Sequence, residues 1–164
     1  MSNSDVVLRH PTLEDGTAIF DLVDACKPLD LNSHYLYLLQ CSHFASTCVV
    51  ATLHGEPVAW VSGYVPPQQP NTFFVWQVAV GQKARGMGLG KQLIEWVVGQ
   101  QQGITKIHTS ITPDNEASWG LFKSLARRWG SDLTQADWFD SQAHFGGRHA
   151  TEVLVEIPLP TTKE

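Results

Sequence analysis

Residues 72–91 read TFFVWQVAVGQKARGMGLGK and carry the clearest secondary-structure signals in the chain. Its first nine residues, 72–80, are rich in valine and aromatic side chains, which is typical of a β-strand. Glycines follow at positions 86, 88 and 90, where a helical pattern over 89–100 begins. Glycine lets the backbone approach a ligand closely, and the N–H groups at a helix start attract anions. The stretch therefore predicts a strand, an anion-binding loop and a helix.

The spacing of these glycines excludes two common phosphate loops. A Walker A loop would need glycine at position 85 and serine or threonine at position 92, where this chain has Arg85 and Gln92. A dinucleotide-binding fingerprint would need glycine at 86, 88 and 91, but position 91 is Lys91 and no first βαβ unit precedes the loop. A different pyrophosphate loop and an ordinary glycine-rich turn both remain open.

The sequence on either side alternates between strand and helix patterns. Further strands are expected at 6–8, 48–53, 57–65, 106–111 and 153–157, with a hairpin turn at His54 and Gly55. A first helix is expected after a Thr12–Asp15 capping box and ends at Pro28. Other helices are expected at roughly 33–44, 89–100 and 115–128.

Two side-chain placements follow from these patterns. In the helix over 33–44, Tyr35, Leu38 and Leu39 are expected to face inward. Near the end of the chain, aromatic residues are expected in closing strands around a Gly146–Gly147 turn; they are Trp138, Phe139 and Phe145.

Composition limits the function. The chain has 164 residues, of which 43% are hydrophobic, so we expect one domain over 1–164. Eleven Lys and Arg against 16 Asp and Glu give a net charge of −5, which argues against nucleic-acid binding. Apolar runs such as 73–76 are too short to span a membrane. Residues 1–5 lack the features of a secretory signal, and the three cysteines, Cys26, Cys41 and Cys48, form no CxxC pair, so a cytoplasmic protein with reduced thiols is expected.

The glycine loop matches a third pattern. Arg85, Gly88 and Gly90 occupy the constrained positions of Gln/Arg-x-x-Gly-x-Gly/Ala, the pyrophosphate loop of Gcn5-related N-acetyltransferases. A strand precedes the loop, a helix opens at it, and a second helix begins at Asn115 after one further strand. Nearly the whole chain resembles this family. The resemblance implies an α/β (α+β) fold in which helices flank a central mixed, mostly antiparallel sheet.

The resemblance also implies acetyl-CoA as co-substrate. Main-chain groups of Val78 and Val80 would hold the pantetheine arm, and Asn115 would bind its end. The diphosphate would lie on the loop, whose implied binding residues are Arg85, Gly86, Met87, Gly88, Leu89, Gly90 and Lys91. Many relatives carry a tyrosine seven residues after the asparagine to protonate the leaving thiolate, and this chain has Phe122 there.

Longer segments resemble one subfamily, the L-2,4-diaminobutyric acid acetyltransferases of ectoine biosynthesis. These segments are 29–39, 41–44, 74–80, 111–115 and 121–127. The resemblance implies acetyl transfer to the 4-amino group of L-2,4-diaminobutyrate, and it suggests a homodimer. The product would then be cyclised to ectoine, a compatible solute made under osmotic stress.

Such a substrate carries two ammonium groups, so its pocket should offer acidic side chains. Asp30 and Glu152 are the candidates, each to bind an ammonium and one to accept its proton. Further candidate substrate-binding residues are Asn32, Tyr35, Trp76, Thr112 and His149. The alternatives are a helix-capping Asp30, a solvated strand residue at Glu152 and a core tryptophan at Trp76.

One segment departs from the subfamily pattern. Ala150 and Thr151 stand between His149 and Glu152, where the subfamily has two acidic residues, which puts the identity of the proton acceptor in doubt. No histidine and cysteine spacing matches a zinc signature, so no metal is expected.

Two other functions remain open: an acetyltransferase of the same fold that acts on another amine or a peptide, and a non-catalytic acyl-CoA-binding module. The second is favoured by Phe122.

Overall fold

A computed structural model describes residues 5–160. The chain forms two compact units. The first contains the residues up to Tyr64 together with Val75–Gln102, and the second contains Val65–Phe74 and the residues from Gly103 onward. The expectation of a single domain over 1–164 stays a prediction. Residues 1–4, most of the segment used to argue against a secretory signal, lie outside the described residues.

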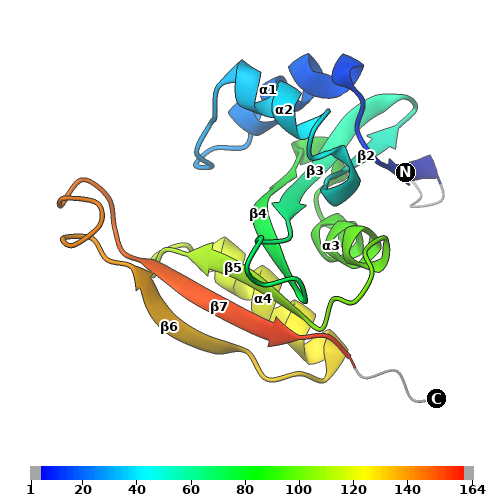
Figure 1. Ribbon diagram of the computed structural model, residues 1–164. Helices are drawn as coiled ribbons and strands as arrows, with labels where there is room; N and C mark the ends of the chain where they lie inside the picture. The colour runs from blue at the N-terminus through cyan, green and yellow to red at the C-terminus, as the bar shows by residue number, and fades with distance from the viewer. Residues whose placement is uncertain (1–4, 161–164) are drawn as a thin grey trace. The chain divides into compact units, whose positions relative to one another are not determined.

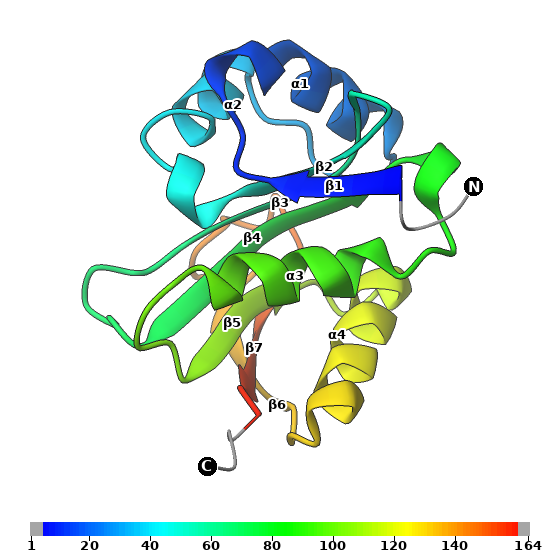
Figure 2. The same cartoon turned by 90° about the vertical axis from the view of Figure 1, so that its right-hand side faces the viewer.

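The first unit is a helix-covered antiparallel sheet. Its elements are β1 (Val6–Arg9), α1 (Gly16–Ala25), α2 (His34–Gln40), β2 (Val49–Leu53), β3 (Glu56–Tyr64), most of β4 (Thr72–Val80) and α3 (Leu89–Gly99). Short 3₁₀ turns cover Leu13–Asp15, Ala45–Thr47 and Gln82–Ala84. Strands β1 and β2 pair antiparallel, as do β2 and β3. Helices α1 and α2 lie on one face of these strands and α3 on the other (Figure 2).

The β2–β3 hairpin turns where the sequence predicts it. His54 has φ 52° and Gly55 has φ 83°, so both central residues adopt positive φ. This is the requirement of the type I′ turn, whose twist matches that of the flanking strands.

Apolar side chains of α1 and α2 meet β3 in the core of this unit. Ile19, Val23 and Cys26 recur at helical spacing and are almost fully buried, and they pack with Tyr37 and Trp60, both 0% exposed. Each fully buried large apolar side chain contributes about 1.5–3 kcal/mol to folding. Ile19 and Val23 therefore lie on the buried face of α1, and Cys26 continues this face at the C-cap.

An ion pair connects β1 to the start of α1. Arg9 Nη1 and Nη2 donate to the two carboxylate oxygens of Asp15 at 2.7 and 2.8 Å. Thr12 N donates to Asp15 Oδ2 at 2.7 Å, so this carboxylate also covers a backbone group, as the predicted capping box requires. The hydrogen bond from Arg9 holds the pKa of Asp15 below its usual range.

The second unit is built from the start of β4, β5 (Lys106–Ile111), α4 (Glu116–Trp129), β6 (Thr134–Phe139) and β7 (Glu152–Pro158). Thr72–Phe74 pair in parallel with β5, while β5 and β6 pair antiparallel with β7. Val153, Val155 and Ile157 are the buried side chains of β7, which gives the period of two expected of a strand. Helix α4 runs along one face of β5 and β7 (Figure 1).

The strand order is β1-β2-β3-β4-β5-β7-β6, and β4 contributes residues to both units. The predicted mixed, mostly antiparallel sheet with flanking helices is confirmed. Across residues 5–160, no helix has both the length and the apolar character needed to cross a membrane.

Three local expectations were wrong. Helix α2 ends at Gln40 instead of Phe44, because the chain turns at Cys41 and enters a 3₁₀ turn. Tyr35 is 70% exposed, whereas Tyr37 and Gln40 are the residues of α2 buried against α1. Phe145 lies in no strand, because β6 and β7 are joined by a long irregular segment over 140–151.

Candidate active site

The glycine loop between β4 and α3 has a backbone that only glycine adopts easily. Gly86 has φ 82° and Gly88 has φ 70°, both in the left-handed region. A Cβ atom on Gly86 would meet nothing within 4 Å, and one on Gly88 would meet only Gln92 Nε2 at 3.9 Å. The strain and the open space fit a loop that leaves room for a ligand close to its backbone.

The start of α3 supplies donors to this space. In the first turn of α3, Gln92 N donates to Gly88 O at 3.3 Å. The residues between these two, from Leu89 onward, carry the first N–H groups of the helix. The first N–H groups of a helix have no intrahelical acceptor and carry the positive end of its dipole. The loop and the helix start are therefore suited to an anion such as a diphosphate.

Arg85 and Val80 contact each other next to the loop. Arg85 Nε donates to Val80 O at 3.4 Å, and Cys26 Sγ donates to the same oxygen at 3.5 Å. The carbonyl of Val80 is therefore engaged within the protein.

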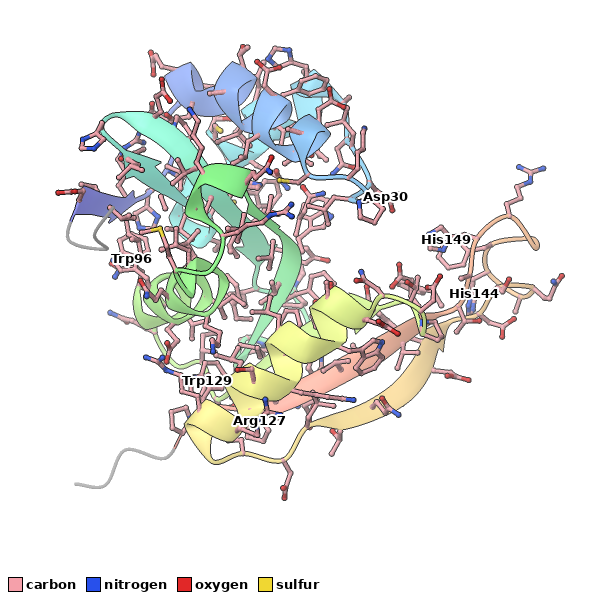
Figure 3. All side chains as sticks on the ribbon, turned by 180° about the vertical axis from the view of Figure 1, so that it is seen from behind. Asp30, Trp96, Arg127, Trp129, His144 and His149 are labelled. Atoms are coloured by element: carbon pink, nitrogen blue, oxygen red, sulfur yellow. The ribbon has the colours of Figure 1, made fainter. Side chains whose placement is uncertain are left out.

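Asp30 lies in the segment between α1 and α2 (Figure 3). Its side chain is exposed, and its carboxylate has no hydrogen-bond or ion-pair partner in the described part of the chain. The alternative role as a helix cap is wrong, because Ser33 Oγ accepts the hydrogen bond from Leu36 N at 3.1 Å and caps α2. The carboxylate is thus free to bind a cation.

Trp76 is 39% exposed, so the alternative of a core tryptophan is wrong. Its ring meets that of Tyr64 edge to face, with centroids 5.5 Å apart. Partial burial raises the pKa of Tyr64. Tyr64 was not among the residues proposed from the sequence, because only the pairing of strands brings the end of β3 to this point of β4.

Two other residues that were not proposed from the sequence contact the segment that carries Asp30. Tyr37 and Gln77 form hydrogen bonds with main-chain groups of Asp30 and Asn32. In the sequence, each stands out only as a side chain with a polar group in an otherwise apolar helix or strand.

In the second unit, Glu152 is the first residue of β7 and pairs with Phe139 of β6. Its Oε2 atom is buried and has no hydrogen-bond partner among the described residues. A buried carboxylate oxygen without a partner is costly, so this atom is suited to a cation or a proton donor from outside the chain. The alternative of a solvated strand residue does not fit this burial.

Thr112 and Asn115 shape the turn between β5 and α4. Thr112 O accepts from Asn115 N at 3.1 Å and from Trp119 Nε1 at 3.0 Å. Asn115 Oδ1 accepts from Ser118 N at 3.2 Å, so Asn115 is the N-cap of α4. Its amide NH₂ group is the part suited to an outside acceptor.

His144 and His149 both lie on the segment that joins β6 to β7 (Figure 3). His149 Nδ1 is 2.7 Å from Ala150 O. A carbonyl only accepts, so Nδ1 carries the proton and Nε2 of the neutral ring is an acceptor. Within residues 5–160, no group of three or more His, Cys, Asp or Glu side chains is arranged to hold a metal ion.

The candidate residues are divided between the units. The first holds the entire glycine loop with Val78 and Val80, together with the substrate candidates Asp30, Asn32, Tyr35 and Trp76. The second holds Thr112, Asn115, His149 and Glu152.

Comparison with known proteins gives one consistent result. The acetyltransferase (GNAT) family matches residues 16–126. The L-2,4-diaminobutyric acid acetyltransferase of Chromohalobacter salexigens is 52% identical over 92% of this chain and 79% of its own length. The enzyme of the same name from Methylotuvimicrobium alcaliphilum is 46% identical over 93% of this chain and 90% of its own.

A solved structure is similar over almost the full chain. It is the diaminobutyrate acetyltransferase of Paenibacillus lautus in complex with L-2,4-diaminobutyric acid and coenzyme A. It is 33% identical, has a TM-score of 0.87, and the match covers 97% of this chain and 98% of that one.

Proposed function

This chain belongs to the acetyltransferase (GNAT) family, and on that premise we propose that it transfers the acetyl group of acetyl-CoA to the 4-amino group of L-2,4-diaminobutyrate. The observation that carries the proposal is the match to the Paenibacillus lautus enzyme, which binds both L-2,4-diaminobutyric acid and coenzyme A. That match extends over 97% of this chain, at 33% identity.

The glycine loop is proposed to bind the diphosphate of acetyl-CoA, which supplies an activated acetyl thioester when bound. A Cβ on Gly86 would meet nothing within 4 Å and one on Gly88 only Gln92 Nε2 at 3.9 Å, and α3 begins directly after them, which fits close approach of an anion. Arg85 and Lys91 add positive charge next to the loop. Met87, Leu89 and Gly90 complete the loop, and the pantetheine arm is assigned to Val78, Val80 and Asn115.

Glu152 is proposed to accept a proton from the amine. The substrate amine is an ammonium near neutral pH and has no lone pair, so it must lose a proton before it attacks the thioester. Glu152 Oε2 has no hydrogen-bond partner within the described residues, so it is available to accept a hydrogen bond from the ammonium and then its proton. The leaving thiolate takes its proton from solvent in this proposal, since Phe122 is 3% exposed and has no proton to give.

The other ammonium is assigned to Asp30, whose carboxylate is exposed and unpartnered within the described residues. The half-exposed indole of Trp76 offers an apolar wall and a cation–π face. Asn32, Tyr35, Thr112 and His149 are the remaining polar groups assigned to the substrate. These assignments rest on residue chemistry and on the local geometry of each unit.

We also propose that the product supplies ectoine synthesis in the cytoplasm during osmotic stress, and that the enzyme is a homodimer. The name shared by the relatives supports the pathway. Every residue of the edge strand β6 is exposed, including the stacked rings of Trp138 and Phe139, 3.9 Å apart. An exposed edge strand that carries two aromatic side chains is a ready surface for a second copy. Sedimentation of a Trp138→Ala variant as a monomer, against a dimeric parent, would support this surface.

Release of free thiol from acetyl-CoA, measured over a panel of amines with mass spectrometry of the products, tests the reaction. The panel contains L-2,4-diaminobutyrate, ornithine, lysine, putrescine and an aminoglycoside. We expect strong preference for diaminobutyrate and acetylation at its 4-amino group. Preference for another amine would retain the acetyltransferase and reject the substrate. Binding of acetyl-CoA without turnover of any amine would indicate an acyl-CoA-binding module.

A further inference from the structure

The segment between α1 and α2 is held by side chains that lie outside it. Gln77 Nε2, from β4, donates to the main-chain oxygen of Asp30 at 2.8 Å. Tyr37 Oη, from α2, accepts from the main-chain N–H of Asn32 at 3.4 Å. The two side chains are joined, because the Tyr37 hydroxyl donates to Gln77 Oε1 at 3.1 Å. Three consecutive hydrogen bonds therefore connect the two residues on either side of Leu31.

This network restrains the main chain on both sides of Leu31, beyond Leu29, which packs on the core. The segment has no regular secondary structure, and the side chains of Asp30, Leu31 and Ser33 are all exposed. The Asp30 carboxylate has no partner of its own within the described residues, so its location follows from its main chain alone. A charged group that must meet a ligand gains affinity when it is held in place before binding.

Tyr37 is suited to this role because it is 0% exposed and cannot reach a substrate from the core. Its ring packs with the core of the first unit, which fixes the hydroxyl and, through it, the amide of Gln77. Side chains alternate along a strand, so Gln77 points away from the face that carries Trp76. Strand β4 thus carries Trp76, a candidate substrate contact, on one face. On its other face it carries Gln77, which holds the main chain of Asp30, a second candidate contact.

We propose that Tyr37 and Gln77 are positioning residues that hold the Asp30 carboxylate ready for the ammonium group of the amine substrate. This inference rests on the proposed function, since it concerns how the same amine is bound. Neither residue touches the substrate. Their loss weakens binding of the amine, because the segment must then be ordered on binding.

Steady-state kinetics of Gln77→Leu, Gln77→Glu and Tyr37→Phe test the proposal. Gln77→Glu keeps an acceptor for the Tyr37 hydroxyl and removes the donor to the Asp30 carbonyl, whereas Tyr37→Phe keeps the buried ring. We expect each to raise the KM for diaminobutyrate about tenfold, the equivalent of one lost hydrogen bond, with the KM for acetyl-CoA within twofold of the parent value.

Gln101→Leu is the matched control. Gln101, which follows the end of α3, also donates from Nε2 to a main-chain oxygen far away in the sequence, that of Ser46, at 2.8 Å. We expect this variant to leave both KM values unchanged. An equal rise of both KM values in the Gln77 variants, or the same rise in Gln101→Leu, would reject a positioning role.

A second comparison separates action through Asp30 from a general loss of structure. Asp30→Asn weakens amine binding by itself, so Gln77→Leu should add less than twofold to the KM in that background. Full additivity of the two changes would overturn the proposal.

Hydrogen exchange of the main-chain amides over residues 29–33 tests, independently of catalysis, whether the network restrains this segment. We expect faster exchange at Asn32 in Tyr37→Phe and Gln77→Leu and no change in Gln101→Leu. Unchanged exchange would show that the network does not hold the segment. If the parent enzyme does not acetylate diaminobutyrate, the proposed function fails, and the exchange result still decides whether the segment is held.

Discussion

Replacement of Gly88 by alanine gives the sharpest test of the cofactor loop. Gly88 has φ 70°, a conformation that costs an L-residue about 1–2 kcal/mol. Alanine also restricts the unfolded chain, which returns about 0.4–1 kcal/mol, so the net loss of stability is about 1 kcal/mol. For a chain of this size that lowers the Tm by about 2–4 °C.

The effect on binding should be larger than the effect on folding. The added methyl group would have only Gln92 Nε2 near it, at 3.9 Å, so it would enter the space assigned to the diphosphate. Loss of one hydrogen bond to a charged group is worth about 1.5–3 kcal/mol. We therefore expect the KM for acetyl-CoA to rise on the order of 10- to 100-fold in initial-rate measurements at saturating amine.

Gly55→Ala is the matched control for this variant. Gly55 has φ 83°, and an added methyl group there would meet nothing within 4 Å, but it lies in the β2–β3 turn. The two variants should lose similar stability, whereas only Gly88→Ala should weaken acetyl-CoA binding. Equal KM values for acetyl-CoA in the two variants would refute the assignment of the diphosphate to this loop.

Three further predictions follow from single groups. Glu152→Gln should lower kcat about 10²- to 10⁴-fold with little change in the KM for acetyl-CoA, and normal turnover would remove Glu152 as the proton acceptor. Arg9 lowers the pKa of Asp15 in the folded state, so this pair stabilises the protein fully above the ordinary aspartate pKa of about 3.9 and its contribution is lost as the pH falls through the lower folded value. Denaturant unfolding of Asp15→Asn between about pH 2 and 5 should lack that part of the pH dependence, and identical profiles would contradict it. Burial raises the pKa of Cys48 to about 12, so this thiol should react with a thiol reagent at neutral pH only after unfolding, and rapid labelling of the native protein would disagree with its burial.

Local patterns predicted most of the elements around the cofactor loop. β4 covers Thr72–Val80 and α3 covers Leu89–Gly99, close to the ranges expected from composition and periodicity. Both predictions are correct for the same reason. A run of valine and aromatic side chains, like a helical repeat, is a property of consecutive residues. The Arg-x-x-Gly-x-Gly spacing marked the loop, in which Gly86 and Gly88 have backbone angles that disfavour other residues.

Helix α2 shows where local patterns fail. Every residue over 35–39 is tyrosine or leucine, so several helical faces are equally apolar. The choice between Tyr35 and Tyr37 depends on which face meets α1, and this is decided by packing between the two helices. In the folded protein Tyr37 is buried, whereas Tyr35 is 70% exposed.

The order of strands and helices, the glycine loop and the likeness to one acetyltransferase family can all be predicted from local sequence patterns. Three features became visible only once the chain was folded: Ser33 and not Asp30 caps α2, Glu152 Oε2 is buried without a partner among the described residues, and Gln77 reaches the Asp30 carbonyl. Local patterns miss these features because the groups that interact lie far apart along the chain. Secondary structure and turns depend on neighbours within a few residues, whereas Gln77 and Asp30 are 47 positions apart and meet only when β4 packs beneath the helices.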